Sequence, residues 1–145
     1  MTKLTVLVTL AVLAPYTVLA DETPGSHFIE NWDLDGNRSV SLEEITERRG
    51  MVFTMFDQNE DGSLDADEYV LFDETRAADM EMNAGGQGKG GDRMQEGLTL
   101  GFNDTNEDGA VSMDEFVSNS AAWVAQVDRD GDSMITAADF GPRGN

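Results

Sequence analysis

Residues 57–68, with the sequence DQNEDGSLDADE, place side-chain oxygens at positions 1, 3, 5, 9 and 12 of a twelve-residue segment. A calcium ion binds about six to eight oxygen atoms at about 2.3–2.6 Å, and a segment of this length can wrap them around the ion. Gly62 at position 6 allows a sharp turn, because a residue without Cβ reaches positive φ without steric cost. A solvated acidic loop would not require this glycine, so the pattern favours a calcium site. The expected ligands are Asp57, Asn59, Asp61, the carbonyl oxygen of Ser63, Asp65 and Glu68.

Three further segments share this arrangement, and we number the four loops 1 to 4 in chain order, so that residues 57–68 are loop 2. Loop 3 covers residues 104–115, and its expected ligands are Asp104, Asn106, Asp108, the carbonyl oxygen of Ala110, Ser112 and Glu115. Loop 1 covers residues 33–44, and its expected ligands are Asp33, Asp35, Asn37, the carbonyl oxygen of Ser39, Ser41 and Glu44. Loop 4 covers residues 128–139, and its expected ligands are Asp128, Asp130, Asp132, the carbonyl oxygen of Met134, Thr136 and Asp139. The sequence therefore predicts up to four bound calcium ions.

Loops 1 and 4 depart from the pattern of loop 2. Arg38 and Ser133 replace the glycine at position 6, and a residue with a Cβ in the left-handed region costs on the order of 1 kcal/mol. Asp139 at position 12 is one methylene shorter than glutamate, so we expect it to bind through one oxygen only. We therefore expect loops 2 and 3 to be the strongest sites.

The composition is strongly acidic, with 29 acidic and nine basic side chains and a net charge of −20. Nucleic acid is excluded as a partner, because phosphate binding depends on basic residues. Much of the negative charge lies in the four loops, so the metal-free chain should repel itself, and ion binding should supply folding free energy. The chain has no cysteine, so it has neither disulfides nor a cysteine-linked lipid.

The first twenty residues have the layout of a secretory signal peptide. Lys3 precedes an apolar run, and small or apolar residues stand before Asp21, so cleavage is expected after Ala20. The alternative is a membrane anchor, but the apolar run is interrupted by Pro15 and is short for a span. We expect an exported protein of the periplasm or extracellular space, with no stable membrane span after cleavage.

The spacing of the loops limits how the chain can fold. Loops 1 and 2 begin 24 residues apart, as do loops 3 and 4, which leaves twelve residues between the loops of each half. These twelve residues form either one connecting helix or a broken turn followed by a returning helix. The apolar residues form one stripe at helical period in each connector and favour the single helix. In the second connector, the run Ser118-Asn119-Ser120 is the expected break.

A continuous helix separates loops that are neighbours in sequence, so each loop must find its partner in the other half. Loop 1 would then pair with loop 4, and loop 2 with loop 3. The residues at position 8 would meet in short antiparallel bridges, Val40 with Ile135 and Leu64 with Val111. The alternative, in which sequence neighbours pair, would instead place Val40 beside Leu64.

The chain divides at a glycine-rich stretch. Residues 21–83 carry loops 1 and 2, residues 84–91 are an expected flexible linker, and residues 92–145 carry loops 3 and 4. Residues 66–82 are expected to form a longer helix, and Gly97 and Gly101 weaken the helix that precedes loop 3.

The four loops resemble those of the EF-hand superfamily, and the fold that this implies is all-α: four EF-hand loops joined by short helices in a compact bundle, with small β-bridges between paired loops. The signal segment and close spacing resemble the short exported EF-hand proteins of bacteria, and the spacing is similar to that of the lanmodulins, which bind lanthanide ions. That family carries proline at position 2 and favours aspartate at position 9. Here position 2 is occupied by Leu34, Gln58, Thr105 and Arg129, and only Asp65 supplies the position-9 aspartate. Loop 4 is also similar to the repeats of dockerins, which are anchoring modules.

The sequence contains no nucleophile with its base and no phosphate-binding loop, so we expect a binding protein rather than an enzyme. A sensor or adaptor would expose an apolar surface to a protein partner on ion binding. That surface would be formed by Trp32, Phe53, Phe56 and Trp123. A buffer or a calcium-stabilised structural module would fold on ion binding and expose nothing. Lanthanide selectivity and anchoring remain alternatives.

Overall fold

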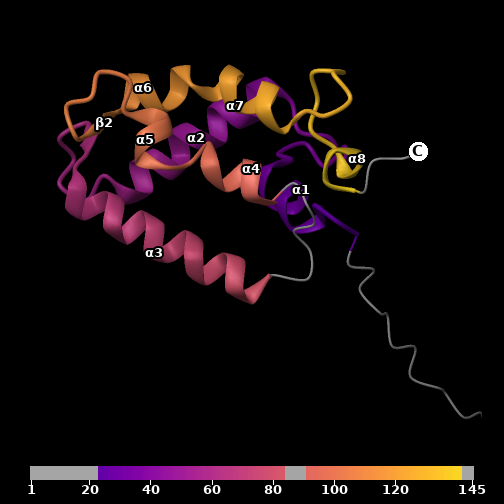
Figure 1. Cartoon of the computed structure of the whole chain (residues 1–145), viewed down its shortest axis with the longest axis horizontal. Coiled ribbons are helices and arrows are strands. Elements are labelled where there is room, and N and C mark those ends of the chain that lie inside the picture. Colours follow the sequence, from indigo (N-terminus) through magenta and orange to yellow (C-terminus); the bar gives the residue numbers. More distant parts are fainter. Residues whose placement is uncertain (1–22, 84–90, 142–145) are drawn as a thin grey trace, which may run out of the picture.

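The computed structural model describes residues 23–83 and 91–141. The predicted signal peptide, nearly all of the predicted linker and the last four residues lie outside these ranges. Figure 1 shows a bundle of helices with loop pairs at its two ends. The helices are α1 (Ser26–Trp32), α2 (Leu42–Phe56), α3 (Ala66–Met82), α4 (Gly91–Glu96), α5 (Leu100–Asn103), α6 (Met113–Ser118), α7 (Ser120–Val127) and α8 (Ala137–Phe140). The strands are β1 (Ser63–Leu64) and β2 (Val111–Ser112). The expectation of a mostly helical protein with small β-bridges is confirmed.

Helix α2 connects loops 1 and 2 without a break, as predicted. The side chain of Ser41 accepts the N–H of Glu44, and the Glu44 carboxylate accepts the N–H of Ser41, which forms a capping box at the start of the helix. Gly50 lies within the helix and does not interrupt it. With fifteen residues at about 1.5 Å each, the helix holds the two loops roughly 22 Å apart along its axis.

The second connector is divided into α6 and α7 at Asn119, within the predicted break. The hydroxyl of Ser120 donates to the carbonyl of Val117 at 2.6 Å, and the hydroxyl of Ser118 donates to the carbonyl of Asp114. These side chains therefore bond to the backbone where α6 ends and α7 begins, as their chemistry predicts. The two short helices still separate loop 3 from loop 4.

The loops pair across the two halves of the chain, as predicted. Strands β1 and β2 are antiparallel and set Leu64 opposite Val111, which joins loop 2 to loop 3. Val40 and Ile135 form an isolated antiparallel bridge that joins loop 1 to loop 4, with N–H to carbonyl distances of 2.8 and 2.9 Å. All four position-8 side chains are fully buried.

Both halves contribute to a single hydrophobic core. Helix α2 packs against α6 and α7, with the rings of Phe53 and Phe116 5.9 Å apart. At the other end, the rings of Trp32 and Trp123 are 4.8 Å apart. Three of the four aromatic residues expected to form an exposed partner surface are buried in this core, namely Phe53, Phe56 and Trp123. In this conformation these three residues pack in the core and do not form an exposed surface.

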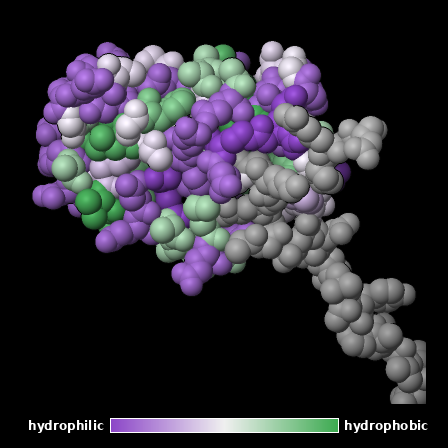
Figure 2. All heavy atoms as spheres, viewed as in Figure 1, coloured by the Kyte–Doolittle hydropathy of each residue, from purple (hydrophilic) through white to green (hydrophobic). Residues whose placement is uncertain are grey.

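On the face shown in Figure 2, hydrophilic residues dominate the coloured surface and the hydrophobic ones form small separate groups. Met55 and Met82 are the most exposed large hydrophobic side chains, at 70% and 78%. Among the helices of residues 23–83 and 91–141, none is long and apolar enough to cross a membrane.

Gly97 allows close packing between the end of α4 and the core. A Cβ at this position would lie 1.9 Å from Cδ1 of the fully buried Trp123. We expect Gly97→Ala to lower the free energy of unfolding by about 1–3 kcal/mol through overpacking. Gly101→Ala is the matched control, because a Cβ there meets nothing within 4 Å, and helix propensity favours alanine. Thermal unfolding of both variants in excess calcium tests this prediction. Equal stability of the two variants would contradict it.

Candidate metal-binding loops

All four loops turn in the same way, although their sequences differ at the turn. Two residues in each loop have positive φ, at positions 4 and 6. They are Gly36 and Arg38, Glu60 and Gly62, Glu107 and Gly109, and Gly131 and Ser133. Loops 1 and 4 carry their glycine at position 4, whereas loops 2 and 3 carry it at position 6. Each loop therefore has one residue with a Cβ in the left-handed region, and the steric penalty that we expected for loops 1 and 4 alone is shared by all four.

The position-1 carboxylate is held at the centre of each turn by backbone N–H groups. In every loop, the N–H of the single glycine donates to this carboxylate. The glycine N to carboxylate O distances are 2.8 Å for Gly36 to Asp33, 3.0 Å for Gly62 to Asp57, 3.0 Å for Gly109 to Asp104, and 2.7 Å for Gly131 to Asp128. The first expected ligand is thus held by a backbone N–H group in all four loops.

The position-12 carboxylate closes each loop from the other end. It accepts the N–H of position 2 and the N–H of position 9 in all four loops. Asp139 makes these contacts at 2.7 and 2.8 Å, so the shorter side chain reaches the same partners as the three glutamates. The first and last expected ligands are therefore both bonded within their own loop in each case.

The expected ligand side chains at positions 3, 5 and 9 are bonded within their own loops. Side chains at positions 3 and 5 accept N–H groups two residues later, as when Asn59 accepts the N–H of Asp61 at 2.9 Å. The same pattern joins Asp35 to Asn37, Asn37 to Ser39, Asp61 to Ser63, Asn106 to Asp108, Asp108 to Ala110, Asp130 to Asp132 and Asp132 to Met134. The position-9 side chains cap the following helices and are Ser41, Asp65, Ser112 and Thr136.

Carboxylate oxygens of three residues lie within 4.8 Å of one another in loop 1 and again in loop 4. These triads are Asp33, Asp35 and Glu44, and Asp128, Asp130 and Asp139. Loops 2 and 3 have Asn59 and Asn106 at position 3, so a neutral amide oxygen replaces one carboxylate there. Oxygen donors of this kind suit calcium, which prefers carboxylate and carbonyl ligands. The structure therefore gathers acidic ligands most closely in the two loops that we expected to be weaker.

The crowding of carboxylates is reflected in their acidity. The N–H of Asp132 lowers the pKa of Asp130, but desolvation and the charges of Asp132, Asp139 and Asp128 outweigh it, so that the pKa is raised. Desolvation is the largest single influence on Asp128 and acts to raise its pKa, but donation from the N–H groups of Ser133, Gly131 and Asp132 together leaves the pKa lowered. A cation placed among these groups would relieve the repulsion that raises the pKa of Asp130.

Glu115 in loop 3 shows the effect of hydrogen bonding without such crowding. The N–H and hydroxyl of Ser112, followed by donation from Thr105 and Asn106, lower its pKa to about 2. A carboxyl whose pKa is lower in the folded state stabilises the fold above its unfolded pKa and loses this effect on acidification. We therefore expect the advantage of wild type over Glu115→Gln to be complete above about pH 5 and to disappear between the ordinary pKa of 4.5 and about 2.

Urea unfolding of both proteins in a calcium chelator across this pH range measures that difference. The comparison cancels the general relief of charge repulsion on acidification, because both chains share every other carboxylate. A difference that stayed constant from pH 6 to pH 2 would contradict the prediction.

Two buried polar residues next to loop 3 were not assigned a role from the sequence. Arg49 and Asn103 are both fully buried, and an Nη atom of Arg49 lies 2.5 Å from Oδ1 of Asn103. The sequence does contain a signal for their burial. Arg49 interrupts the apolar stripe of α2, and Asn103 stands where the other three loops are preceded by an apolar residue.

Comparison with known families identifies the two middle loops. Residues 51–72 and 102–118 match the family model described as EF hand, and these segments contain loops 2 and 3 with parts of their flanking helices. Neither the curated proteins nor the solved structures gave a significant match. The two matching segments, which the β1–β2 sheet joins, support membership of the EF-hand superfamily.

Proposed function

We propose that this protein binds calcium ions in all four loops, two at each end of the bundle, and has no enzymatic activity of its own. The observation that carries the proposal is the arrangement of carboxylates in loops 1 and 4, each with three acidic ligands within 4.8 Å. These loops share their turn geometry with loops 2 and 3, which match the EF-hand family. A calcium ion would neutralise each cluster and would take oxygen ligands from both ends of its loop.

Within this function, we favour a calcium buffer or calcium-stabilised module that acts outside the cytoplasm. The buried positions of Phe53, Phe56 and Trp123 support this choice, because ion binding would then complete a closed core. Export is inferred from residues 1–20, and the mass of the protein recovered from the producing cells tests cleavage after Ala20.

A sensor or adaptor is the second candidate, and one cavity favours it. A hollow of about 300 Å³ lies between α1, α2, α3 and α4, with walls that include Phe28, Trp32, Phe56 and Phe72. A groove lined by aromatic residues is a suitable site for an apolar segment of a protein partner. An apolar fluorescent dye separates the two functions. Calcium should increase dye binding to a sensor and decrease dye binding to a buffer.

Calorimetric titration of the chelator-treated protein tests calcium binding itself. We expect binding heat to continue until up to four calcium ions have been added per chain. Elemental analysis should detect calcium that remains bound to the protein after gel filtration. A competition with lanthanum then measures the preference between the two ions, and a large preference for lanthanum would support the lanthanide alternative. The absence of both binding heat and recovered ion would refute the proposed function.

A further inference from the structure

Arg49 is a buried cation in the middle of α2, and its exposed fraction is 0%. Within the described ranges it has no carboxylate partner closer than 4 Å. Its Nε donates to the carbonyl of Phe116 at 2.8 Å, and Nη1 donates to the carbonyl of Gly97 at 3.0 Å. Its Nη2 donates to Oδ1 of Asn103. A buried charge is costly unless its donors are bonded, so these contacts are needed for the folded state.

The same guanidinium also lies against two aromatic rings. Its central carbon is 4.1 Å from the ring centroid of Phe116 and 5.1 Å from that of Trp123. Burial lowers the pKa of Arg49 to about 10, so the group remains a cation at neutral pH. The planar fork of arginine can hold three acceptors and a ring face at once, which lysine cannot do.

The partners of Arg49 stand at the two ends of loop 3. Asn103 directly precedes Asp104, the first expected ligand, and Phe116 directly follows Glu115, the last one. The Arg49 side chain is thus bonded to both segments that flank loop 3. The distance between those segments sets the distance between the ligands at positions 1 and 12.

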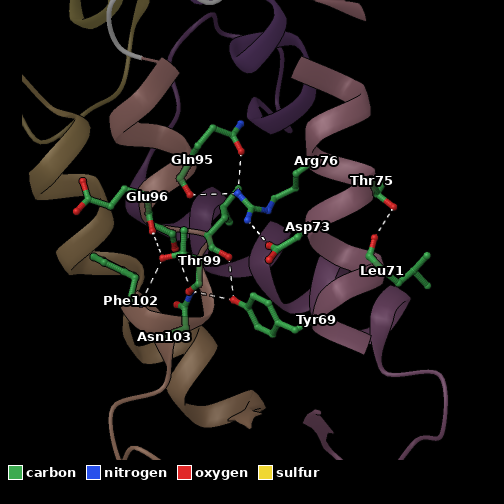
Figure 3. A network of polar contacts seen from close by, with 12 residues as sticks. Tyr69, Leu71, Asp73, Thr75, Arg76, Gln95, Glu96, Thr99, Phe102 and Asn103 are labelled. Carbon is green, nitrogen blue, oxygen red and sulfur yellow. Dashed lines mark hydrogen bonds and ion pairs between the residues drawn. The ribbon is translucent and has the colours of Figure 1, made fainter. Parts of the chain in front are cut away.

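Loop 2 joins the same network through Tyr69, which directly follows its last ligand, Glu68. The Tyr69 hydroxyl donates to the carbonyl of Leu98 at 2.8 Å, and the amide nitrogen of Asn103 donates to that hydroxyl at 3.3 Å. Figure 3 shows Tyr69 reaching from α3 toward Asn103 across the bundle. The polar network therefore joins the residues that flank loop 2 and loop 3.

The other loop pair is flanked differently. The residues directly before and after loops 1 and 4 are Trp32, Ile45, Val127 and Phe140. All four are hydrophobic members of the core or pack against it. None of the hydrogen bonds of Arg49 reaches these four residues. At this end the carbonyl of Asp139 instead accepts from Arg129 at 3.1 Å and from Arg93 at 3.5 Å. Removal of Arg49 should therefore affect the two loop pairs unequally.

We propose that Arg49 is a positioning residue for the loop 2 and loop 3 pair, which holds the two ends of loop 3 at the spacing where Asp104 and Glu115 bind the same calcium ion. The proposal rests on the proposed function, because it concerns the affinity of those sites. It also gives a reason why the two loop pairs should differ in calcium affinity. Arg49 would preorganise loop 3 for the ion without binding the ion itself. Residues that hydrogen-bond metal ligands directly typically change metal affinity by about 10- to 100-fold. Arg49 bonds to the residues next to the ligands, so we expect an effect near the lower end of this range.

The four loop glycines provide one reporter for each loop. Gly36, Gly62, Gly109 and Gly131 are the single glycines of loops 1 to 4, and each N–H donates to the position-1 carboxylate. Their amide signals in nitrogen–proton correlation spectra should therefore shift when an ion binds to that carboxylate. A calcium titration followed at these four signals gives an affinity for each loop separately.

The test compares Arg49→Met with Arg48→Met in the full chain. Both changes remove one positive charge from neighbouring positions of α2, but Arg48 is partly exposed and makes no side-chain hydrogen bond to residues 23–83 or 91–141. For Arg49→Met we expect an affinity loss of about tenfold or more at Gly62 and Gly109, and less than about twofold at Gly36 and Gly131. Arg49→Lys should show nearly the same loss, because it retains the charge without the fork. Arg48→Met should bind as wild type does at all four loops.

Tyr69→Phe tests the network if Arg49→Met does not fold. It removes one hydroxyl and should weaken binding at Gly62 and Gly109 only, by about threefold to tenfold. Equal losses at all four glycines, or no loss in any variant, would overturn the positioning role while leaving calcium binding intact. If the four glycine amide signals of the wild-type protein did not shift on addition of calcium, the proposed function would be overturned as well.

Discussion

Removal of calcium with a chelator is expected to lower the melting temperature by about 15 °C or more. An ion that binds only the folded state stabilises it by about 2.7 kcal/mol when its concentration is 100 times the dissociation constant. Two such sites contribute about 5 kcal/mol, and each kcal/mol shifts the melting temperature of a chain of this size by roughly 3–5 °C. Calorimetry of the protein in excess calcium and in excess chelator measures the shift directly.

The control for this prediction separates site binding from general screening. The chain has a net charge of −20, so its acidic side chains repel one another. High salt reduces that repulsion without placing ions in the loops. Sodium chloride added to the chelated protein should therefore recover only a small part of the lost stability. Full recovery in sodium chloride alone, or a melting temperature that did not respond to the chelator, would contradict the prediction.

The arrangement of the loops could be predicted from the sequence because two simple signals agreed. Only twelve residues separate loop 1 from loop 2, and their apolar side chains repeat with the period of one helix. A rigid helix of that length leaves no geometry in which Val40 reaches Leu64, so each had to bridge to the other half. The observed bridges of Val40 to Ile135 and of Leu64 to Val111 follow from this constraint.

The turn geometry of loops 1 and 4 was harder to predict, because it depends on two positions together. The absence of glycine at position 6 appeared to be a defect at Arg38 and Ser133. The structure places a second left-handed residue at position 4, where these loops have Gly36 and Gly131. The glycine has exchanged places with the residue that bears a Cβ, and the count of strained residues is the same in every loop.

The role of Arg49 could not be predicted, because an arginine in a helix is usually exposed to solvent. Its burial depends on acceptors that come together only in the folded bundle: two carbonyls from distant segments and the amide of Asn103. Each irregularity was visible in the sequence, but nothing in the sequence connects position 49 with position 103. Only tertiary packing pairs them.

The second large effect is expected at the position-12 glutamate of loop 2. Glu68→Gln should lower the calcium affinity of loop 2 by more than about 100-fold, because it removes a direct ligand rather than a supporting group. Glutamine retains the shape of the side chain, and its amide oxygen can still accept the N–H of Gln58, which Glu68 now accepts at 2.8 Å. Calcium titration followed at the amide of Gly62 measures this loss.

Glu60→Gln is the matched control, because it removes the same charge from the same loop at position 4, where no ligand is expected. Its affinity should stay within about threefold of wild type, as expected for an exposed charge in solvent. The sheet that joins Leu64 to Val111 also makes a prediction for loop 3: in Glu68→Gln, binding at Gly109 should weaken by a smaller factor, while Gly36 and Gly131 respond normally. If Glu60→Gln and Glu68→Gln weakened binding equally, net charge rather than ligation would control affinity, and Glu68 would not be a ligand.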